Sequence, residues 1–117
     1  MTAHDRLLDI EEKYRGLVSK IVPVEIDEGA LRLTIFFNDK SNLRVTELWK
    51  SDKLVKYSYY WLSNDNGLIV GWDNAPHHKR VNSFPHHKHV KIQKNIQPSS
   101  ESRLEDVMDI ILQEKAR

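Results

Sequence analysis

Leu-Val-Lys-Tyr-Ser-Tyr-Tyr-Trp-Leu, at residues 54–62, is the segment that most clearly indicates the architecture. Side chains in a strand point alternately to opposite faces of the sheet. One face therefore carries Val55, Tyr57, Tyr59 and Trp61, and the other carries Leu54, Lys56, Ser58, Tyr60 and Leu62. Both faces are partly apolar, which predicts a central strand. We expect helices to cover one face and a second, half-polar face to remain free for a ligand.

Turn-forming residues recur on both sides of this segment at intervals of about 8 to 12 residues, a spacing typical of antiparallel strands. The pattern between these turns predicts five strands, and residues 86–92 regain a strand-like alternation. Pro23 cannot donate a hydrogen bond to a neighbouring strand, so the first strand is predicted at the edge of the sheet. The five predicted strands are residues 21–26, 31–37, 43–50, 54–62 and 68–72.

Two amphipathic helices are predicted, one at each end of the chain. Thr2 and Asp5 have the spacing of a capping box before a helix at about residues 4–18. Its apolar stripe is Leu7, Ile10, Tyr14, Leu17 and Ile21, whereas Arg6 belongs to its polar face.

A short linker at residues 97–100 precedes the second helix, for which Ser102 and Glu105 form the predicted capping box. Its apolar stripe is Leu104, Val107, Met108, Ile111 and Leu112. The sequence thus predicts an α+β fold, with a single antiparallel sheet of five to six strands and the N-terminal and C-terminal helices packed on one face.

The 117 residues predict a single domain, 1–117. There is no cysteine, which excludes disulfides, a thiolate nucleophile and any metal site built on thiolates. No segment resembles a signal peptide or reaches the roughly 18 apolar residues of a membrane span. We therefore expect a cytoplasmic protein that does not bind membranes.

Histidines gather in residues 72–89, which hold five of the six in the chain. Histidine changes charge near neutral pH without help, so this segment suits proton transfer. The candidate catalytic residues are Asp73, His77, His78, His86, His87 and His89. No acidic residue lies between Asp73 and Glu101, and the cations of this stretch predict an anionic partner such as RNA. The candidate RNA-binding residues are Lys79, Arg80, Lys88 and Lys91.

These residues predict a metal-independent ribonuclease with no cofactor. One imidazole would deprotonate a ribose 2′-hydroxyl, another would protonate the leaving oxygen, and the cations would stabilise the transition state. A metal-dependent hydrolase is an alternative, because His87 and His89 point to the same side of a strand and His77 or Asp73 can complete a ligand set. The adjacent cations weigh against a metal ion. A non-catalytic module that binds nucleic acid or protein is the third interpretation.

Three motifs resemble those of the TumE family, the small toxin components of prokaryotic toxin–antitoxin pairs. They are Tyr-Ser-Tyr-Tyr-Trp at 57–61, Trp-Asp-Asn-Ala-Pro-His-His at 72–78 and Phe-Pro-His-His-Lys-His at 84–89. The resemblance extends to Asn-Ile-Gln-Pro-Ser at 95–99 and covers nearly the whole chain. It implies a toxin of a type II pair and a cognate antitoxin as partner. Its expected activity, by analogy with other small toxins, is that of an endoribonuclease, and its oligomeric state stays open.

Overall fold

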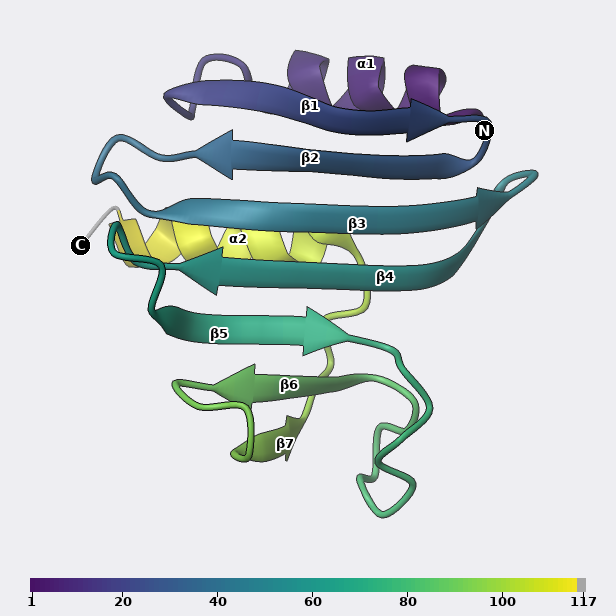
Figure 1. Cartoon of the computed structure of the whole chain (residues 1–117), viewed down its shortest axis with the longest axis vertical. Coiled ribbons are helices and arrows are strands. Elements are labelled where there is room, and N and C mark those ends of the chain that lie inside the picture. Colours follow the sequence, from purple (N-terminus) through teal and green to yellow (C-terminus); the bar gives the residue numbers. More distant parts are fainter. Residues whose placement is uncertain (116–117) are drawn as a thin grey trace.

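The computed structural model describes residues 1–115, so the last two residues of the predicted domain, 116 and 117, lie outside the described residues. The chain forms an α+β fold whose strands follow one another in a single antiparallel meander (Figure 1). The elements are α1 (Ala3–Tyr14), β1 (Lys20–Asp27), β2 (Ala30–Phe36), β3 (Asn42–Lys50), β4 (Lys53–Leu62), β5 (Leu68–Asp73), β6 (His87–Val90), β7 (Ile96–Pro98) and α2 (Leu104–Lys115).

The sheet contains seven strands in the described part of the chain, so the predicted count of five to six is too low. The predicted strand at 86–92 ends at Val90, where a tight turn begins with Lys91 at φ 68°. Asn95 closes this turn, because the Val90 amide donates to its carbonyl at 3.0 Å. The chain then returns as β7, which includes part of the predicted linker. Pro98 is tolerated there because β7 is an edge strand.

The prediction for residues 54–62 is confirmed, since β4 lies fourth among the seven strands. β1 occupies the other edge of the sheet, as Pro23 predicts, and its register shifts between Pro23 and Glu25. Tyr57, Tyr59 and Trp61 are buried. The aromatic residues of this face are therefore packing residues.

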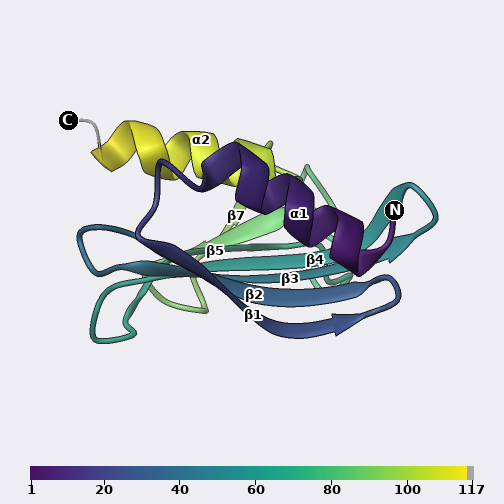
Figure 2. The same cartoon turned by 90° about the horizontal axis from the view of Figure 1, so that it is seen from above.

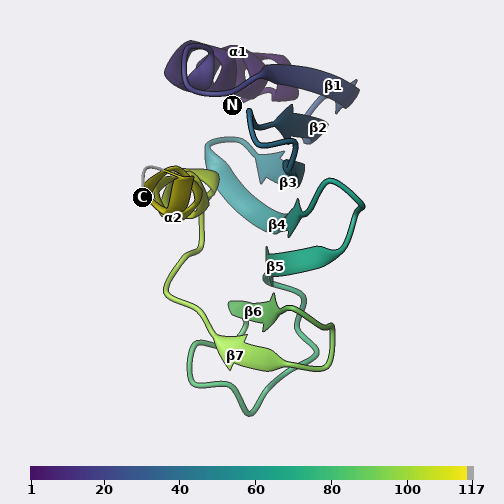
Figure 3. The same cartoon turned by 90° about the vertical axis from the view of Figure 1, so that its left-hand side faces the viewer.

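Both helices cover the same face of the sheet (Figures 2 and 3). The hydrophobic core lies between them and the aromatic face of β4, and no helix within residues 1–115 covers the opposite face, called here the open face. Burial of this apolar surface is the main stabilising contribution to such a domain. The core includes Ile10, Leu33, Val45, Tyr59 and Met108.

The helix boundaries correct two predictions. The Thr2–Asp5 capping box is present, but α1 ends at Tyr14 rather than near residue 18, and Leu17 of the predicted stripe is exposed. The predicted capping box of the second helix is absent. The Ser102 amide donates to Asp106 at 3.2 Å, not to Glu105.

Glu105 is instead part of a buried ion cluster with Arg6 and Glu47. Arg6 donates to Glu47 at 2.7 and 3.0 Å and to Glu105 at 2.8 and 3.2 Å. Although burial alone lowers the pKa of Arg6, these hydrogen bonds raise it above its usual value. The prediction that Arg6 lies on the polar face of α1 is therefore wrong, because the guanidinium joins α1, β3 and α2 under the helices.

Neither helix in the described part of the chain has the length and apolar character needed to cross a membrane.

Candidate functional site

The register of β4, β5 and β6 gathers polar side chains on the open face. Asp73 pairs with Ser58 on one side and with His87 on the other, and Gly71 lies between Tyr60 and His89 in the same way. Directly opposed residues in antiparallel strands share a face. His87 and His89 therefore lie on the open face beside Asp73, which confirms the prediction that these two histidines share one side of a strand.

Asp73 lies between two imidazole rings. Its Oδ1 is 2.9 Å from Nε2 of His87, and its Oδ2 is 3.3 Å from Nε2 of His89. The opposite ring nitrogens contact backbone carbonyls: Nδ1 of His87 lies 2.9 Å from the Pro85 oxygen, and Nδ1 of His89 lies 2.7 Å from the Gln93 oxygen. Both rings are buried and held at both nitrogens.

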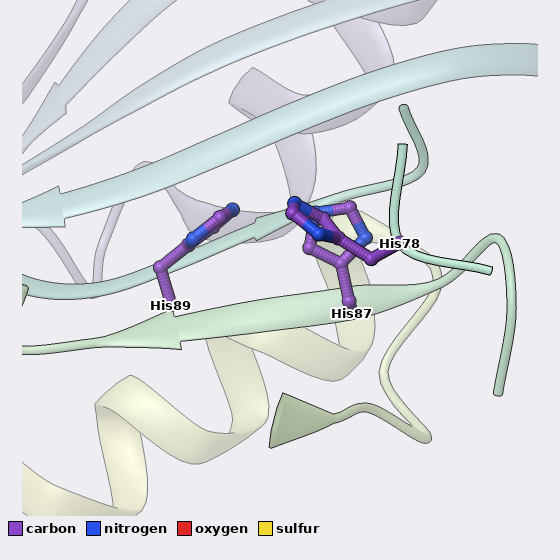
Figure 4. A group of neighbouring side chains, drawn as sticks. All are labelled: His78, His87 and His89. Carbon is purple, nitrogen blue, oxygen red and sulfur yellow. The ribbon is translucent and has the colours of Figure 1, made fainter. Parts of the chain in front are cut away.

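His78 reaches the same place from the loop between β5 and β6. Its ring meets the edge of the His87 ring, with the centroids 4.8 Å apart, and lies 5.9 Å from the His89 ring. The three rings converge (Figure 4), and their ligand nitrogens all lie within 4.8 Å of one another. Within residues 1–115 the His78 ring has no hydrogen-bond partner. We call Asp73, His78, His87 and His89 the histidine–aspartate cluster.

Asn74 fixes the start of the loop that carries His78. Its side chain makes two hydrogen bonds to the backbone of β4, accepting from the Tyr57 amide at 2.9 Å and donating to the Val55 carbonyl at 3.1 Å. The Ala75 amide donates to Asp73 Oδ1 at 3.0 Å, so the loop also orients the carboxylate. The position of the cluster thus depends on contacts with β4, the strand that precedes β5 in the chain.

Tyr60 is a functional candidate that the sequence analysis does not single out. Its hydroxyl donates to Asp73 Oδ2 at 3.2 Å. The ring lies across Gly71, where an added Cβ would come within 2.7 Å of a ring carbon. Gly71 thereby leaves the space through which Tyr60 reaches the carboxylate.

Burial and charge tune the groups around Asp73. Burial, followed by the Asp73 charge, raises the pKa of Tyr60 to about 12, so its hydroxyl stays a hydrogen-bond donor at neutral pH. Burial and the neighbouring His87 and His89 lower the pKa of His78, and Asp73 opposes this shift.

The side chains of His86 and Lys88 lie on the other face, as their alternation with His87 predicts. Nδ1 of His86 is 2.8 Å from the Tyr57 hydroxyl, and the two rings stack at 5.8 Å. Lys88 lies 3.8 Å from Glu101. The structure therefore separates these two predicted site residues from the histidine–aspartate cluster.

The other predicted residues of the loop lie beside the cluster. A hollow of about 420 Å³ is lined by His77, His78, Lys79 and Arg80, among others. Lys79 and Arg80 are exposed, so they present charge next to His78. Lys91 is exposed at the turn after β6.

A second hollow, of about 520 Å³, lies on the open face next to the cluster, on the half-polar side that is expected to remain free for a ligand. Arg32 and Arg44 line it together with Tyr60 and Gln93. The alternation of β2 and β3 assigns both arginines to the open face, because their neighbours in sequence are buried leucine and valine residues. Strand alternation in the sequence is therefore enough to predict that both arginines share one face. It does not predict the strand register that brings them near the histidines.

The family comparison agrees with the resemblance of the three motifs. The model of the family described as Toxin TumE matches residues 7–117. Comparison with curated proteins and with solved structures gives no match. Because the matched region covers nearly all of the sequence, this chain belongs to the TumE toxin family.

Proposed function

We propose that this toxin is an endoribonuclease whose reaction centre is the histidine–aspartate cluster. The observation that carries the proposal is the placement of two imidazoles on one carboxylate with a third imidazole against them, on the open face and beside exposed cations. Imidazoles move protons near neutral pH, and fixed positive charge stabilises a phosphorane-like transition state. Of the six predicted catalytic residues, Asp73, His78, His87 and His89 form the proposed centre, whereas His77 and His86 lie outside it.

The proposed reaction is an internal transfer at phosphorus. The ribose 2′-oxygen bonds to the adjacent phosphorus as the bond to the 5′-oxygen breaks, and the proton lost by the 2′-hydroxyl is balanced by one given to the 5′-oxygen. The products are a 2′,3′-cyclic phosphate and a 5′-hydroxyl. In a metal-free route, the unbound His78 ring accepts the 2′-proton, and the protonated ring of His87 or His89 gives a proton to the 5′-oxygen and supplies positive charge. A metal ion held by the same side chains is the other source of that charge.

The surroundings of the cluster support an RNA substrate. Lys79 and Arg80 lie on one side, and Arg32 and Arg44 line the hollow on the other. Phosphate contacts position a nucleic acid without reading its sequence. We propose that the RNA backbone runs from the hollow of the two arginines past the cluster to the loop, and that Lys88 makes no phosphate contact.

Cleavage of a circular RNA by purified protein tests this function, because a circle has no free end for an exonuclease. The wild-type protein should linearise many RNA molecules per protein molecule and leave cyclic phosphate ends. His87→Ala and His89→Ala should each lower the rate by ~10² to 10⁴-fold. His4→Ala, a change of the exposed histidine on α1, is the matched control and should keep the wild-type rate. Binding without turnover would instead support the non-catalytic module.

We also propose that a cognate antitoxin covers the basic loop. Interfaces match opposite potentials, so an acidic segment is the expected partner of Lys79 and Arg80. The double reversal Lys79→Glu with Arg80→Glu should weaken a complex with the product of the neighbouring gene. Glu12→Lys with Arg15→Glu changes exposed charges around the end of α1 and should leave it intact. If the α1 variant weakens the complex and the loop variant does not, the antitoxin binds α1 rather than the basic loop.

A further inference from the structure

We infer that the histidine–aspartate cluster binds a divalent transition-metal ion, with His78, His87, His89 and Asp73 as ligands. The inference begins with the proton positions. Backbone carbonyls only accept hydrogen bonds, so Nδ1 of His87 carries the hydrogen that contacts Pro85, and Nδ1 of His89 carries the hydrogen that contacts Gln93. In each neutral ring the Nε2 lone pair is then directed at Asp73.

This arrangement is incomplete without a positive charge at its centre. Two lone pairs and a carboxylate face one another at 2.9 and 3.3 Å, and like groups of this kind repel. Two added protons would satisfy them, at the cost of two imidazolium charges on one buried carboxylate. One divalent ion satisfies both lone pairs and the carboxylate together.

The distances fit this ion. With metal–ligand bonds of about 2.0–2.1 Å, neighbouring ligands on a tetrahedral zinc lie about 3.3 Å apart. The separations of Asp73 from the two Nε2 atoms, 2.9 and 3.3 Å, already have this size. The nitrogens of His78, His87 and His89, within 4.8 Å of one another, need further convergence. His78 lies on a loop, which permits that movement.

The outer contacts are those of a metal site. Ligating histidines commonly donate their second ring nitrogen to a carbonyl, which fixes the ring and its tautomer, and ligating carboxylates are themselves hydrogen-bonded. Here the Tyr60 hydroxyl and the Ala75 amide both donate to Asp73. Three imidazoles and one carboxylate, without thiolate, favour zinc and related first-row ions over magnesium or calcium.

The cation that follows His87 in sequence does not oppose such an ion. Lys88 points to the other face of β6 and lies 3.8 Å from Glu101. Lys79 and Arg80 are exposed in the loop. The repulsion expected from the sequence is therefore reduced by strand alternation and solvent.

Titration of the chelator-treated full-length chain with Co²⁺ tests the inference, because cobalt in a tetrahedral site of nitrogen and oxygen ligands absorbs visible light. We expect saturation at one Co²⁺ per chain and its displacement by Zn²⁺, with the bound zinc confirmed by elemental analysis. His87→Ala and His89→Ala should each weaken binding more than 100-fold. Tyr60→Phe, which removes one outer contact, should weaken it about 10 to 100-fold. His4→Ala should bind like wild type.

His78→Ala distinguishes loss of metal binding from loss of fold. It changes a half-buried loop side chain, so it should weaken metal binding without altering the circular dichroism spectrum. A folded wild-type protein that takes up neither ion at micromolar concentration would overturn the inference. So would metal binding that persists unchanged in His87→Ala with His89→Ala. In that case a doubly protonated, metal-free cluster is the correct description.

The catalytic use of the ion rests on the proposed ribonuclease activity, but its binding does not. Full RNA cleavage in chelator, with no metal bound, would exclude the ion from the reaction and support the metal-free ribonuclease, whereas the Co²⁺ titration still decides whether the site binds metal. Stoichiometric metal binding without RNA cleavage would support the metal site and contradict the ribonuclease proposal.

Discussion

The two faces of the sheet each carry a buried group of ionisable side chains, and the groups differ in how they respond to the loss of a partner. Under the helices, Arg6 is bound by both Glu47 and Glu105. On the open face, one carboxylate, Asp73, faces His87 and His89, with His78 beside them. A guanidinium cannot lose its charge at ordinary pH, whereas an imidazole can. The ion cluster is therefore suited to stabilising the fold, and the histidine–aspartate cluster is suited to proton transfer.

Glu47→Ala should have the largest effect on stability. It removes the acceptor of Arg6, Trp49 and Tyr59 and leaves a permanent buried charge poorly compensated. Breaking a buried ion pair in this way costs about 3–5 kcal/mol, a large part of the stability of a domain of this size. Urea unfolding measures the loss.

Asp9→Ala is the control for Glu47→Ala, because Asp9 also contacts Arg6, at 3.0 Å, but lies near the surface. Loss of an exposed partner costs about 0–1 kcal/mol. Similar unfolding midpoints for the two variants would show that burial of the ion cluster does not matter.

Asp73→Asn should have a small effect on stability and a large effect on RNA cleavage. Its effect on stability is expected to be about 1–2 kcal/mol, since the two rings lose one polar partner but keep their contacts with the Pro85 and Gln93 carbonyls. RNA cleavage, in contrast, should fall by ~10² to 10⁴-fold. Parallel urea unfolding and cleavage measurements check both values. A loss of stability as large as that of Glu47→Ala, or an unchanged cleavage rate, would contradict the division between the two faces.

Acid should weaken the ion cluster through Glu105. Although burial alone raises the pKa of Glu105, hydrogen bonds from Arg6 and Lys13 lower it from 4.5 to about 2. A carboxyl with a lowered folded-state pKa stabilises the protein above its unfolded pKa, and this contribution is lost as the pH falls from about 4.5 to about 2. The free energy of unfolding, followed by urea titration across that range, should fall more steeply for wild type than for Glu105→Gln. Parallel curves would contradict the assignment.

The smallest expected effect is on the salt dependence of RNA binding. It distinguishes Arg44 from Lys88, two cations that the sequence does not distinguish. The logarithm of RNA affinity falls with the logarithm of salt concentration by about 0.7 per phosphate contact on a single strand. Arg44→Ala, on the open face, should reduce this slope by about that amount. Lys88→Ala, on the other face beside Glu101, should leave it unchanged. Equal slopes for the two variants would remove the proposed path of RNA across the open face.

Several features of the fold follow from local sequence because their causes are local. Alternation in β4 predicts its two faces and its central place, and Pro23 predicts an edge strand. The Thr2–Asp5 capping box and the apolar stripe of α2 depend on contacts within one or two helical turns. Tight turns are less clear in the sequence. The sequence does not predict β7, because the turn before it has a positive φ at Lys91, a position where no glycine indicates a turn.

The composition and spacing of residues 72–89 determined that this chain carries histidines and cations suited to phosphate chemistry, and its motifs determined the family. Tertiary structure decided which of these residues lie together. The pairing of β5 with β6 places Asp73 opposite His87, and strand alternation turns His86 and Lys88 away. The pairing of β5 with β4 brings Tyr60 to Asp73, and the packing of α1 and α2 turns Arg6 from a surface residue into a buried one. Registers and helix packing join residues that are distant in the chain, so the burial of the whole core fixes them and no local pattern contains them.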